Sequence, residues 1–308
     1  MATVIVFGPT GNNGSVVAQI AQQKGAKVWL AMRDTSKPIP GLSPEAEKAG
    51  NFSRVQADLS KPESVALAVK TAGATRAFIY VAQGTPDHMK GTAEALKTAG
   101  IEFVVLLSSY TIGNTPPSDV QRSEIIPYHH AQLEVTLSEV FGQDGYVAVR
   151  PGAFATNLLR QKVGILSGEV EMYGPGFKID CITPVDMGGV IGTILAEGPR
   201  DGQRVVFLYG PQILSQKLAL EIIGEVLGKK IKVVGIDAEE AMAQYLAKGA
   251  PKPVAEYFIK ALGDTDPEME DGSWLANYKE GVENVKKYMG KPGTGFREWV
   301  EANPSLFT

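Results

Sequence analysis

Three glycines near the start of the chain have the spacing of a turn that could hold a phosphate. Gly8, Gly11 and Gly14 form a GxxGxxG pattern, which follows the apolar run 3–7 and precedes a stretch with helical spacing at 15–21. Glycines suit this place because the chain must turn sharply, pass close to a pyrophosphate and begin a helix whose N-terminal amides face the anion. We expect the phosphate contacts to come from the backbone around Thr10, Gly11, Asn12 and Asn13 and from the Thr10 hydroxyl. The pattern predicts a dinucleotide-binding turn rather than a plain connection.

The next apolar run, 26–32, ends in a positive residue. Arg33 stands about 20 residues past the glycines, where NAD-binding proteins place an acid for the ribose hydroxyls. A guanidinium can pair with a 2′-phosphate through two parallel hydrogen bonds, whereas an acid would repel it. Lys37 adds a second positive charge. The pattern favours NADP(H) over NAD(H), unless both residues are ordinary surface charges or Asp34 pairs with Arg33.

Further cofactor contacts are expected from the loops that follow other strands. In parallel sheets, ligands bind outside the carboxyl ends of the strands. We therefore assign cofactor-binding positions to Asp58, Ala82, Gln83 and Ser108.

Hydroxyl and imidazole groups occur where the reaction is expected. Ser109 follows the apolar run 103–107, and Tyr128 and His130 open the next helical stretch. Short-chain dehydrogenases carry Tyr-x-x-x-Lys here, in which the lysine lowers the pKa of the tyrosine and the phenol moves a proton. In this chain the fourth residue is Gln132, which carries no charge. We take Tyr128, His130 and Ser109 as catalytic candidates, while roles in packing or in capping a loop stay open for each.

Composition limits the other classes of function. The net charge is −4 and the basic residues are scattered, which disfavours binding to nucleic acid or to an anionic membrane. Adjacent histidines point apart, so we expect no metal site, and the single cysteine, Cys181, is expected to be a small core residue. Since we find neither a signal peptide nor an apolar run of membrane-spanning length, we expect a cytoplasmic protein.

Alternating patterns predict the elements that position these residues. Short apolar runs separated by amphipathic stretches predict a parallel sheet covered on both faces, a doubly wound α/β fold. The predicted strands are 3–7, 26–32, 53–56, 77–81, 103–107, 146–149 and 204–208, and the predicted helices include 62–71, 86–99, 128–141 and one that begins at Pro184.

The pattern changes after residue 152 and becomes mostly helical from residue 215. We predict a Rossmann domain over 1–152, to which 183–210 returns. A smaller, mostly helical substrate lobe is predicted from 153–182 and 211–308. Residues 264–272 are acidic and broken by proline, and we expect a mobile loop or a lid there.

Several stretches together resemble the NmrA-like family of atypical short-chain dehydrogenases. They are the glycine turn 8–14, Arg33, residues 150–157 and residues 182–188. In the carboxyl half, 208–215, 226–230 and 295–300 are similar to NmrA-like reductases, including the fungal iminium reductases of ergot-alkaloid pathways.

The resemblance implies an NADP(H)-binding domain with a small-molecule pocket between two lobes. It implies that His130 lies near the nicotinamide ribose and that Pro151 and Phe154 flank the nicotinamide. The expected pocket lining is Tyr110, Tyr128, Phe154 and Tyr173.

The absence of a lysine at position 132 limits the acceptors that the site can reduce. Hydride delivery to a ketone generates an alkoxide that needs a proton, whereas delivery to an iminium carbon gives a neutral amine. We therefore predict an NADPH-dependent reductase of a small, largely apolar iminium, quinone or conjugated acceptor, and the resemblance to the family implies a role in alkaloid or other secondary metabolism. Two alternatives stay open: a redox sensor that binds NADP(H) without turnover, and a pocket that retains the cofactor but cyclises a reactive intermediate. The partner we expect is a small molecule, and the sequence indicates no particular oligomer.

Overall fold

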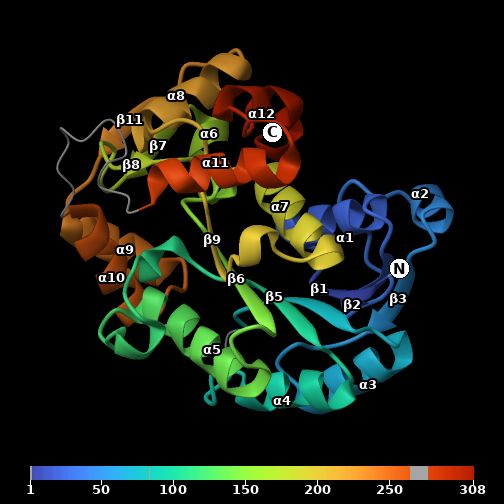
Figure 1. Ribbon diagram of the computed structural model, residues 1–308. Helices are drawn as coiled ribbons and strands as arrows, with labels where there is room; N and C mark the ends of the chain where they lie inside the picture. Colours follow the sequence, from blue (N-terminus) through green and yellow to red (C-terminus); the bar gives the residue numbers. More distant parts are fainter. Residues whose placement is uncertain (1, 83, 264–276) are drawn as a thin grey trace.

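The central element is a parallel sheet with helices between its strands (Figure 1). The computed structural model describes residues 2–82, 84–263 and 277–308. Within these residues, seven strands pair in the order β3-β2-β1-β4-β5-β6-β9. They are β1 (Thr3–Phe7), β2 (Lys27–Met32), β3 (Ser53–Gln56), β4 (Arg76–Tyr80), β5 (Phe103–Leu107), β6 (Tyr146–Pro151) and β9 (Val205–Leu208). All neighbouring pairs are parallel, so the predicted doubly wound α/β fold is confirmed.

Helices cover both faces of this sheet. Those that follow its strands are α1 (Asn12–Gln23), α2 (Pro44–Ala49), α3 (Pro62–Ala72), α4 (Lys90–Ala99), α5 (Ile125–Phe141) and α7 (Pro184–Glu197). α1 and α7 pack together on one face, and α3, α4 and α5 lie on the other (Figure 1). Along β1, the side chains of Val4 and Val6 belong to the core between the sheet and helices α1 and α7. Those of Ile5 and Phe7 belong to the core between the sheet and helices α3, α4 and α5. Because successive side chains of a strand point to opposite faces, a strand buried on both sides is continuously apolar.

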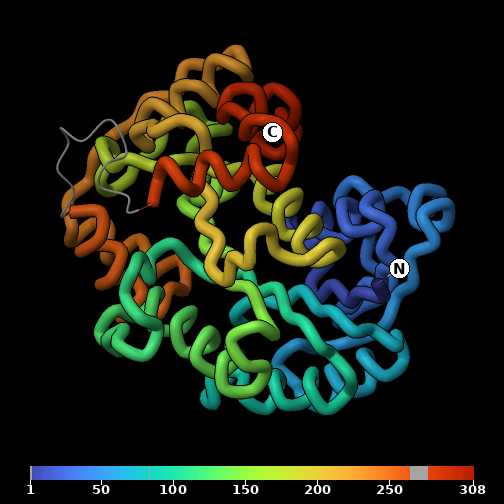
Figure 2. The backbone as a smooth tube through the Cα atoms, in the orientation of Figure 1, coloured from blue at the N-terminus to red at the C-terminus, as the bar shows by residue number. Residues whose placement is uncertain are grey.

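Most of the remaining described elements form a smaller body beside the sheet, and the carboxyl terminus lies in it (Figure 2). Its elements are α6 (Lys162–Ser167), β7 (Glu169–Met172), β8 (Lys178–Ile179), β10 (Leu214–Ser215), α8 (Gln216–Val226), β11 (Lys232–Gly235), α9 (Ala238–Ala247), α10 (Lys252–Gly263), α11 (Tyr278–Met289) and α12 (Phe296–Ala302). Short 3-10 helices are η1 (Tyr110–Ile112), η2 (Pro117–Asp119), η3 (Ala155–Gln161), η4 (Arg200–Gly202) and η5 (Pro304–Leu306). Much of this body shares a core of its own, drawn from residues 155–181, 214–231 and 296–307. α11 instead packs on β9 and α7, and its Val285 and Tyr288 belong to the core between α1, α7 and the sheet. The boundaries of the two lobes stay predictions.

Some elements differ from the predicted ones. α4 begins at Lys90 rather than at residue 86, because His88 and Met89 have φ values of 51° and 63° and cannot continue a helix. α5 begins before Tyr128, because Pro127 falls in its first turn, where a missing N–H costs nothing. β11 was not predicted, and it pairs with the distant β7. Gln83 and the predicted loop 264–272 lie outside the described residues.

Candidate active site

The glycine turn connects the carboxyl end of β1 to the start of α1. Gly8 has a φ of 71°, in the left-handed region that favours glycine. A Cβ on Gly14 would stand 2.2 Å from the Gly8 carbonyl oxygen, so only glycine lets the helix begin this close to the turn. The Gly11 amide donates to the Gly8 carbonyl at 3.1 Å. The first turn of α1, which is fully described, has neither an acidic residue nor a side-chain cap, so the amides of Asn12 and Asn13 can donate to an anion.

Two buried polar atoms at the predicted site lack a hydrogen-bond partner among the described residues. They are Oδ1 of Asn13 and Nδ1 of His130. An unsatisfied buried polar atom costs about 1–3 kcal/mol, so it marks a place where a polar ligand is favoured. The glycine cradle and these two atoms fit a dinucleotide that extends from α1 to α5.

The loop after β2 presents two cations to solvent. Arg33 and Lys37 are both exposed. Asp34 does not pair with Arg33, because its Oδ1 accepts from the Ser36 amide at 3.0 Å and from the Ser36 hydroxyl at 2.6 Å. Within the described ranges the Arg33 guanidinium makes no ion pair. It is therefore available for an anionic ligand.

Tyr80, which the sequence analysis missed, covers the turn from the end of β4. A Cβ on Gly8 would stand 2.7 Å from the Tyr80 ring. Burial raises the pKa of Tyr80, the charge of Arg33 lowers it and that of Asp58 raises it, so these side chains are close enough to interact. Asp58 accepts from the Ser60 hydroxyl at 2.7 Å, which lowers the pKa of its carboxyl. A polar aromatic residue at the end of a strand was the signal that could have identified Tyr80.

A buried ion pair joins the carboxyl ends of β5 and β6 to α5. The Arg150 guanidinium donates to both carboxylate oxygens of Glu134, at 2.9 and 2.6 Å, and to the Gly113 carbonyl at 2.8 Å. Ser108 donates to the same carboxylate at 2.5 Å. Ser108, Glu134 and Arg150 are each less than 5% exposed, so the Ser108 hydroxyl is directed into the interior. In the sequence, this ion pair could have been inferred from two residues of opposite charge, each of which stands in a mainly apolar element.

His130 lies one helical turn before Glu134 and therefore on the same face of α5. Burial, with a smaller effect of neighbouring His129, lowers the pKa of His130 to about 4. Its imidazole is neutral at pH 7 and carries no acidic imidazolium proton. This favours the hydrogen-bonding, ribose-binding interpretation of His130 over that of a proton donor.

Tyr128 packs at the outer end of the same helix. Its ring contacts the small apolar cluster that includes Ile112 and Val120. Its ring also meets the ring of His88 edge to face, with centroids 5.6 Å apart and planes at 86°. His88 comes from the β4–α4 loop, so Tyr128 lies where this loop meets α5.

The remaining predicted residues occupy different surroundings. The Ser109 hydroxyl caps η1, accepting from the Thr111 amide at 3.3 Å. The centroids of the Tyr110 and Tyr209 rings lie 6.0 Å apart.

Three further candidates make backbone contacts. The backbone of Phe154 forms an isolated β-bridge with that of Ile182. Ala82 donates its amide to the Met89 sulfur at 3.2 Å. Pro151 ends β6 opposite Leu208.

Tyr173 lies in the smaller body, where it lines a cavity of about 50 Å³ with Met172 and Tyr245. No interaction among the described residues joins Tyr173 to Tyr128 or Phe154. Its place in the substrate pocket stays a prediction.

Asp180 is a buried carboxylate at the junction of the two parts, and the sequence analysis did not select it. Its two oxygens accept from the amides of Ala153 at 2.6 Å and Gly210 at 2.8 Å. Burial raises the pKa of Asp180 to about 7, although the hydrogen-bonded amides lower it. A Cβ on Gly152 would stand 2.4 Å from its Oδ1. Asp180 therefore fixes the segment that follows Pro151.

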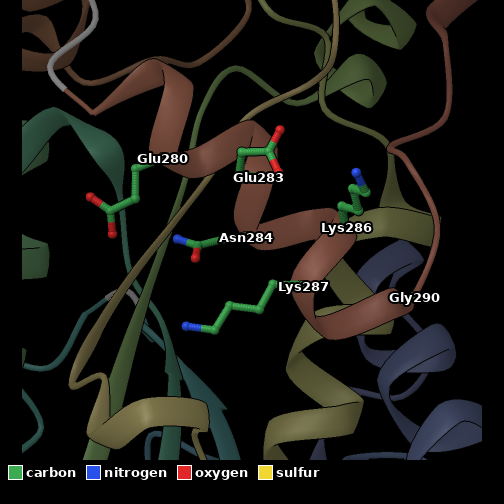
Figure 3. A pocket seen from close by; sticks show the side chains of 6 residues that line it. All are labelled: Glu280, Glu283, Asn284, Lys286, Lys287 and Gly290. Carbon is green, nitrogen blue, oxygen red and sulfur yellow. The ribbon is translucent and has the colours of Figure 1, made fainter.

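A hollow of about 490 Å³ runs along α11 (Figure 3). Its lining carries both signs of charge, from Glu280, Glu283, Lys286 and Lys287. Asn284 donates to the Phe207 carbonyl at 3.1 Å, and Lys287 pairs with Asp201 at 2.8 Å. These contacts attach α11 to β9 and η4, so we assign no ligand to this hollow.

In the described part of the chain, no cluster of three or more His, Cys, Asp or Glu side chains could hold a metal ion. Cys181 is buried, as predicted. None of the described helices combines the length and the apolar character needed to cross a membrane.

Residues 1–280 match the model of the NmrA-like family. The chain belongs to this family. It is 34% identical to the nitrogen metabolite regulation-like protein bik4 of Gibberella fujikuroi, covering 97% of this chain and 95% of that protein. It is 26% identical to the NAD(P)H azoreductase of Xenophilus azovorans, over 99% of both chains. It is 28% identical to festuclavine dehydrogenase easG of Aspergillus fumigatus, over 67% of this chain and 65% of that protein. The predicted resemblance to NmrA-like and ergot-alkaloid proteins is thus confirmed.

The family fold is shared with solved structures. An NADPH complex of the NADPH-dependent quinone oxidoreductase of Escherichia coli aligns with a TM-score of 0.70 at 18% identity. The alignment covers 99% of this chain and 100% of that chain. At this identity the likeness supports the Rossmann-type fold.

Proposed function

We propose that this chain is an NADPH-dependent reductase that transfers hydride to a small, largely apolar acceptor. The observation that carries the proposal is the glycine cradle at the start of α1, with an unpaired Arg33 at the end of β2. The activities of the azoreductase and dehydrogenase relatives and of the quinone oxidoreductase with the same fold support it. When bound, NADPH supplies a hydride from its nicotinamide ring.

Each part of the site has a role in this proposal. The amides of Asn12 and Asn13 bind the pyrophosphate, and the Arg33 and Lys37 cations bind the 2′-phosphate. His130 hydrogen-bonds the nicotinamide ribose. Gly8, Thr10, Gly11, Gly14, Asp58, Ala82, Ser108, Pro151 and Phe154 stay proposed contacts of the cofactor.

The surroundings of the reacting end favour acceptors that need no strong acid. His130 is neutral, because burial lowers its pKa to about 4. Gln132 stands where a lysine would activate Tyr128. An iminium, a quinone or a conjugated acceptor fits this site better than a simple ketone, whose alkoxide product must be protonated at once. The similarity to festuclavine dehydrogenase supports a role in alkaloid or other secondary metabolism.

Oxidation of NADPH by the purified protein tests this function. We expect NADPH to be consumed with a cyclic iminium or a quinone at least about tenfold faster than with a ketone of similar size, a difference of about 1.4 kcal/mol in the barrier. NADPH without acceptor is the control, and product must form in equal amount. Consumption with the ketone alone would contradict the proposed acceptor class.

A redox sensor is the second candidate. The missing lysine favours it, and so does the similarity to bik4, a nitrogen metabolite regulation-like protein. This candidate predicts tight NADPH binding without oxidation by any of the acceptors. The acceptor experiment therefore separates the two functions.

A further inference from the structure

We infer that Arg54 is a positioning residue for recognition of the 2′-phosphate, acting through residues 33–37, here called the phosphate loop. The inference rests on the proposed function, because this loop carries the Arg33 and Lys37 side chains proposed to bind that phosphate. Arg54 itself lies on β3, in the neighbouring strand.

A single guanidinium joins three elements. Nη1 of Arg54 donates to two backbone carbonyls of the phosphate loop, those of Thr35 at 2.5 Å and Lys37 at 2.9 Å. Its Nε and Nη2 donate to the two carboxylate oxygens of Glu47, on α2, at 2.6 and 2.7 Å. Because a bidentate pair fixes the plane of the guanidinium, Glu47 holds Arg54 in the orientation that binds the loop.

A second side chain of β3 holds the start of the same loop. Gln56 lies two residues after Arg54, on the same face of the strand, and donates to the Arg33 carbonyl at 3.0 Å. Asp34 binds the Ser36 amide within the loop. The carbonyls of Arg33, Thr35 and Lys37 are therefore occupied by β3 and do not face an incoming anion. This arrangement fixes the backbone from which the Arg33 and Lys37 side chains extend.

The charge of Arg54 is already neutralised. Its hydrogen bond to Glu47 raises the pKa of Arg54, and both side chains are at most one-quarter exposed. Arg54 thus adds little net positive charge for a phosphate, and its contribution comes from loop geometry. The Glu47→Gln variant separates the two effects, because it leaves Arg54 unneutralised but less firmly oriented. A direct charge effect would strengthen NADPH binding, whereas a positioning effect weakens it.

The first test compares the dissociation constants of NADPH and NADH by nicotinamide fluorescence. We expect Arg54→Met to raise the Kd of NADPH about tenfold, while the Kd of NADH changes less than about twofold. Arg204→Met is the matched control, because Arg204 also binds a carboxylate and a carbonyl, both of Asp144, at 2.7 and 3.2 Å. It should change neither constant. Arg54→Lys, which keeps the charge without the fork, should weaken NADPH by an intermediate factor.

The second test is the double variant Arg33→Ala/Arg54→Met. If Arg54 acts through the phosphate loop, this variant should lose little more NADPH affinity than Arg33→Ala alone. Additive losses, equal losses for NADH and NADPH, or tighter NADPH binding by Glu47→Gln would overturn the inference. Should Arg54→Met not fold, Arg54→Lys and Glu47→Gln carry the same test. A wild-type protein that binds neither cofactor, or both equally, contradicts the proposed function instead.

Discussion

At the scale of single residues, the surroundings of His130 oppose the stability of the free protein to its proposed function. Its Nδ1 is buried without a partner among the described residues, and burial lowers its pKa to about 4. Such a group destabilises the free protein, since a buried polar atom without a hydrogen bond is unfavourable. Residues of this kind are retained where a ligand uses them.

The His130→Leu variant tests this role. We expect the free energy of unfolding of the ligand-free protein to stay unchanged or to rise by about 1 kcal/mol, because the unsatisfied nitrogen is removed. The Kd of NADPH should rise about fivefold, since a hydrogen bond between two uncharged groups contributes about 1 kcal/mol to binding. Denaturant unfolding and nicotinamide fluorescence measure the two quantities.

The neighbouring His129→Leu is the control for this variant. His129 is exposed, so its replacement should leave NADPH affinity unchanged. Loss of stability in His130→Leu with unchanged NADPH affinity would make His130 a packing residue.

Local patterns identified some site residues and could not identify others. Gly8 and Gly14 were predictable as turn residues, and Arg33 as a candidate, because these expectations depend on spacing along the chain. The roles proposed for Arg54 and Tyr80 were not predictable, because they depend on contacts with a loop and a turn on neighbouring strands. A side chain that acts across strands leaves no signal in its own segment.

At the scale of elements, the ends of β6 and β9 are joined by one carboxylate. The Asp180 carboxylate accepts hydrogen bonds from the amides of Ala153 and Gly210, which follow these strands. It lies 2% exposed, and its pKa is raised to about 7 by burial. We therefore expect the junction between the two parts of the molecule to respond to pH.

Asp180 should make stability depend on pH between its unfolded and folded pKa values, 3.8 and about 7. Because the folded value is raised, its contribution is complete below the lower value and is lost as pH rises through about 7. The free energy of unfolding falls by about 1.4 kcal/mol per pH unit between the two pKa values, so its loss from pH 5 to pH 8 is about 2–3 kcal/mol. In Asp180→Asn this loss should disappear, so wild type exceeds the variant by more at pH 5 than at pH 8. Denaturant unfolding at both pH values measures the difference, and a difference independent of pH would contradict the assignment.

Elements that are determined by their own sequence were predicted better than elements that depend on contacts with distant parts of the chain. The strands at 3–7, 53–56 and 103–107 have the predicted bounds. For 3–7 and 103–107 the reason is that a short apolar run in a buried parallel sheet is distinctive. β11 was missed, because Lys232–Gly235 is short and half-exposed and exists by pairing with β7. The start of α4 was misplaced, because left-handed His88 and Met89 are not visible from residue type.

At the scale of the whole molecule, the smaller body is attached to the sheet region at several points. The Asp186 carboxylate of α7 accepts from the Thr294 amide at 2.8 Å and from its hydroxyl at 3.0 Å, which ties the carboxyl-terminal segment to the cofactor side. α10 contacts α5, the helix that carries Tyr128 and His130. A substrate held between these parts would meet residues from both. This arrangement supports the proposed reductase site.

The most direct test of the central claim is a titration of the purified protein with NADPH and NADH by nicotinamide fluorescence. We predict that NADPH binds at least about tenfold more tightly than NADH, a preference of about 1.4 kcal/mol. In Arg33→Asp this preference should vanish, because an acid repels the 2′-phosphate, while NADH affinity is retained. Lys24→Asp serves as the control, since Lys24 is an exposed cation at the far end of α1. Equal binding of the two cofactors would contradict the assignment of Arg33, and binding of neither would contradict that of the glycine turn.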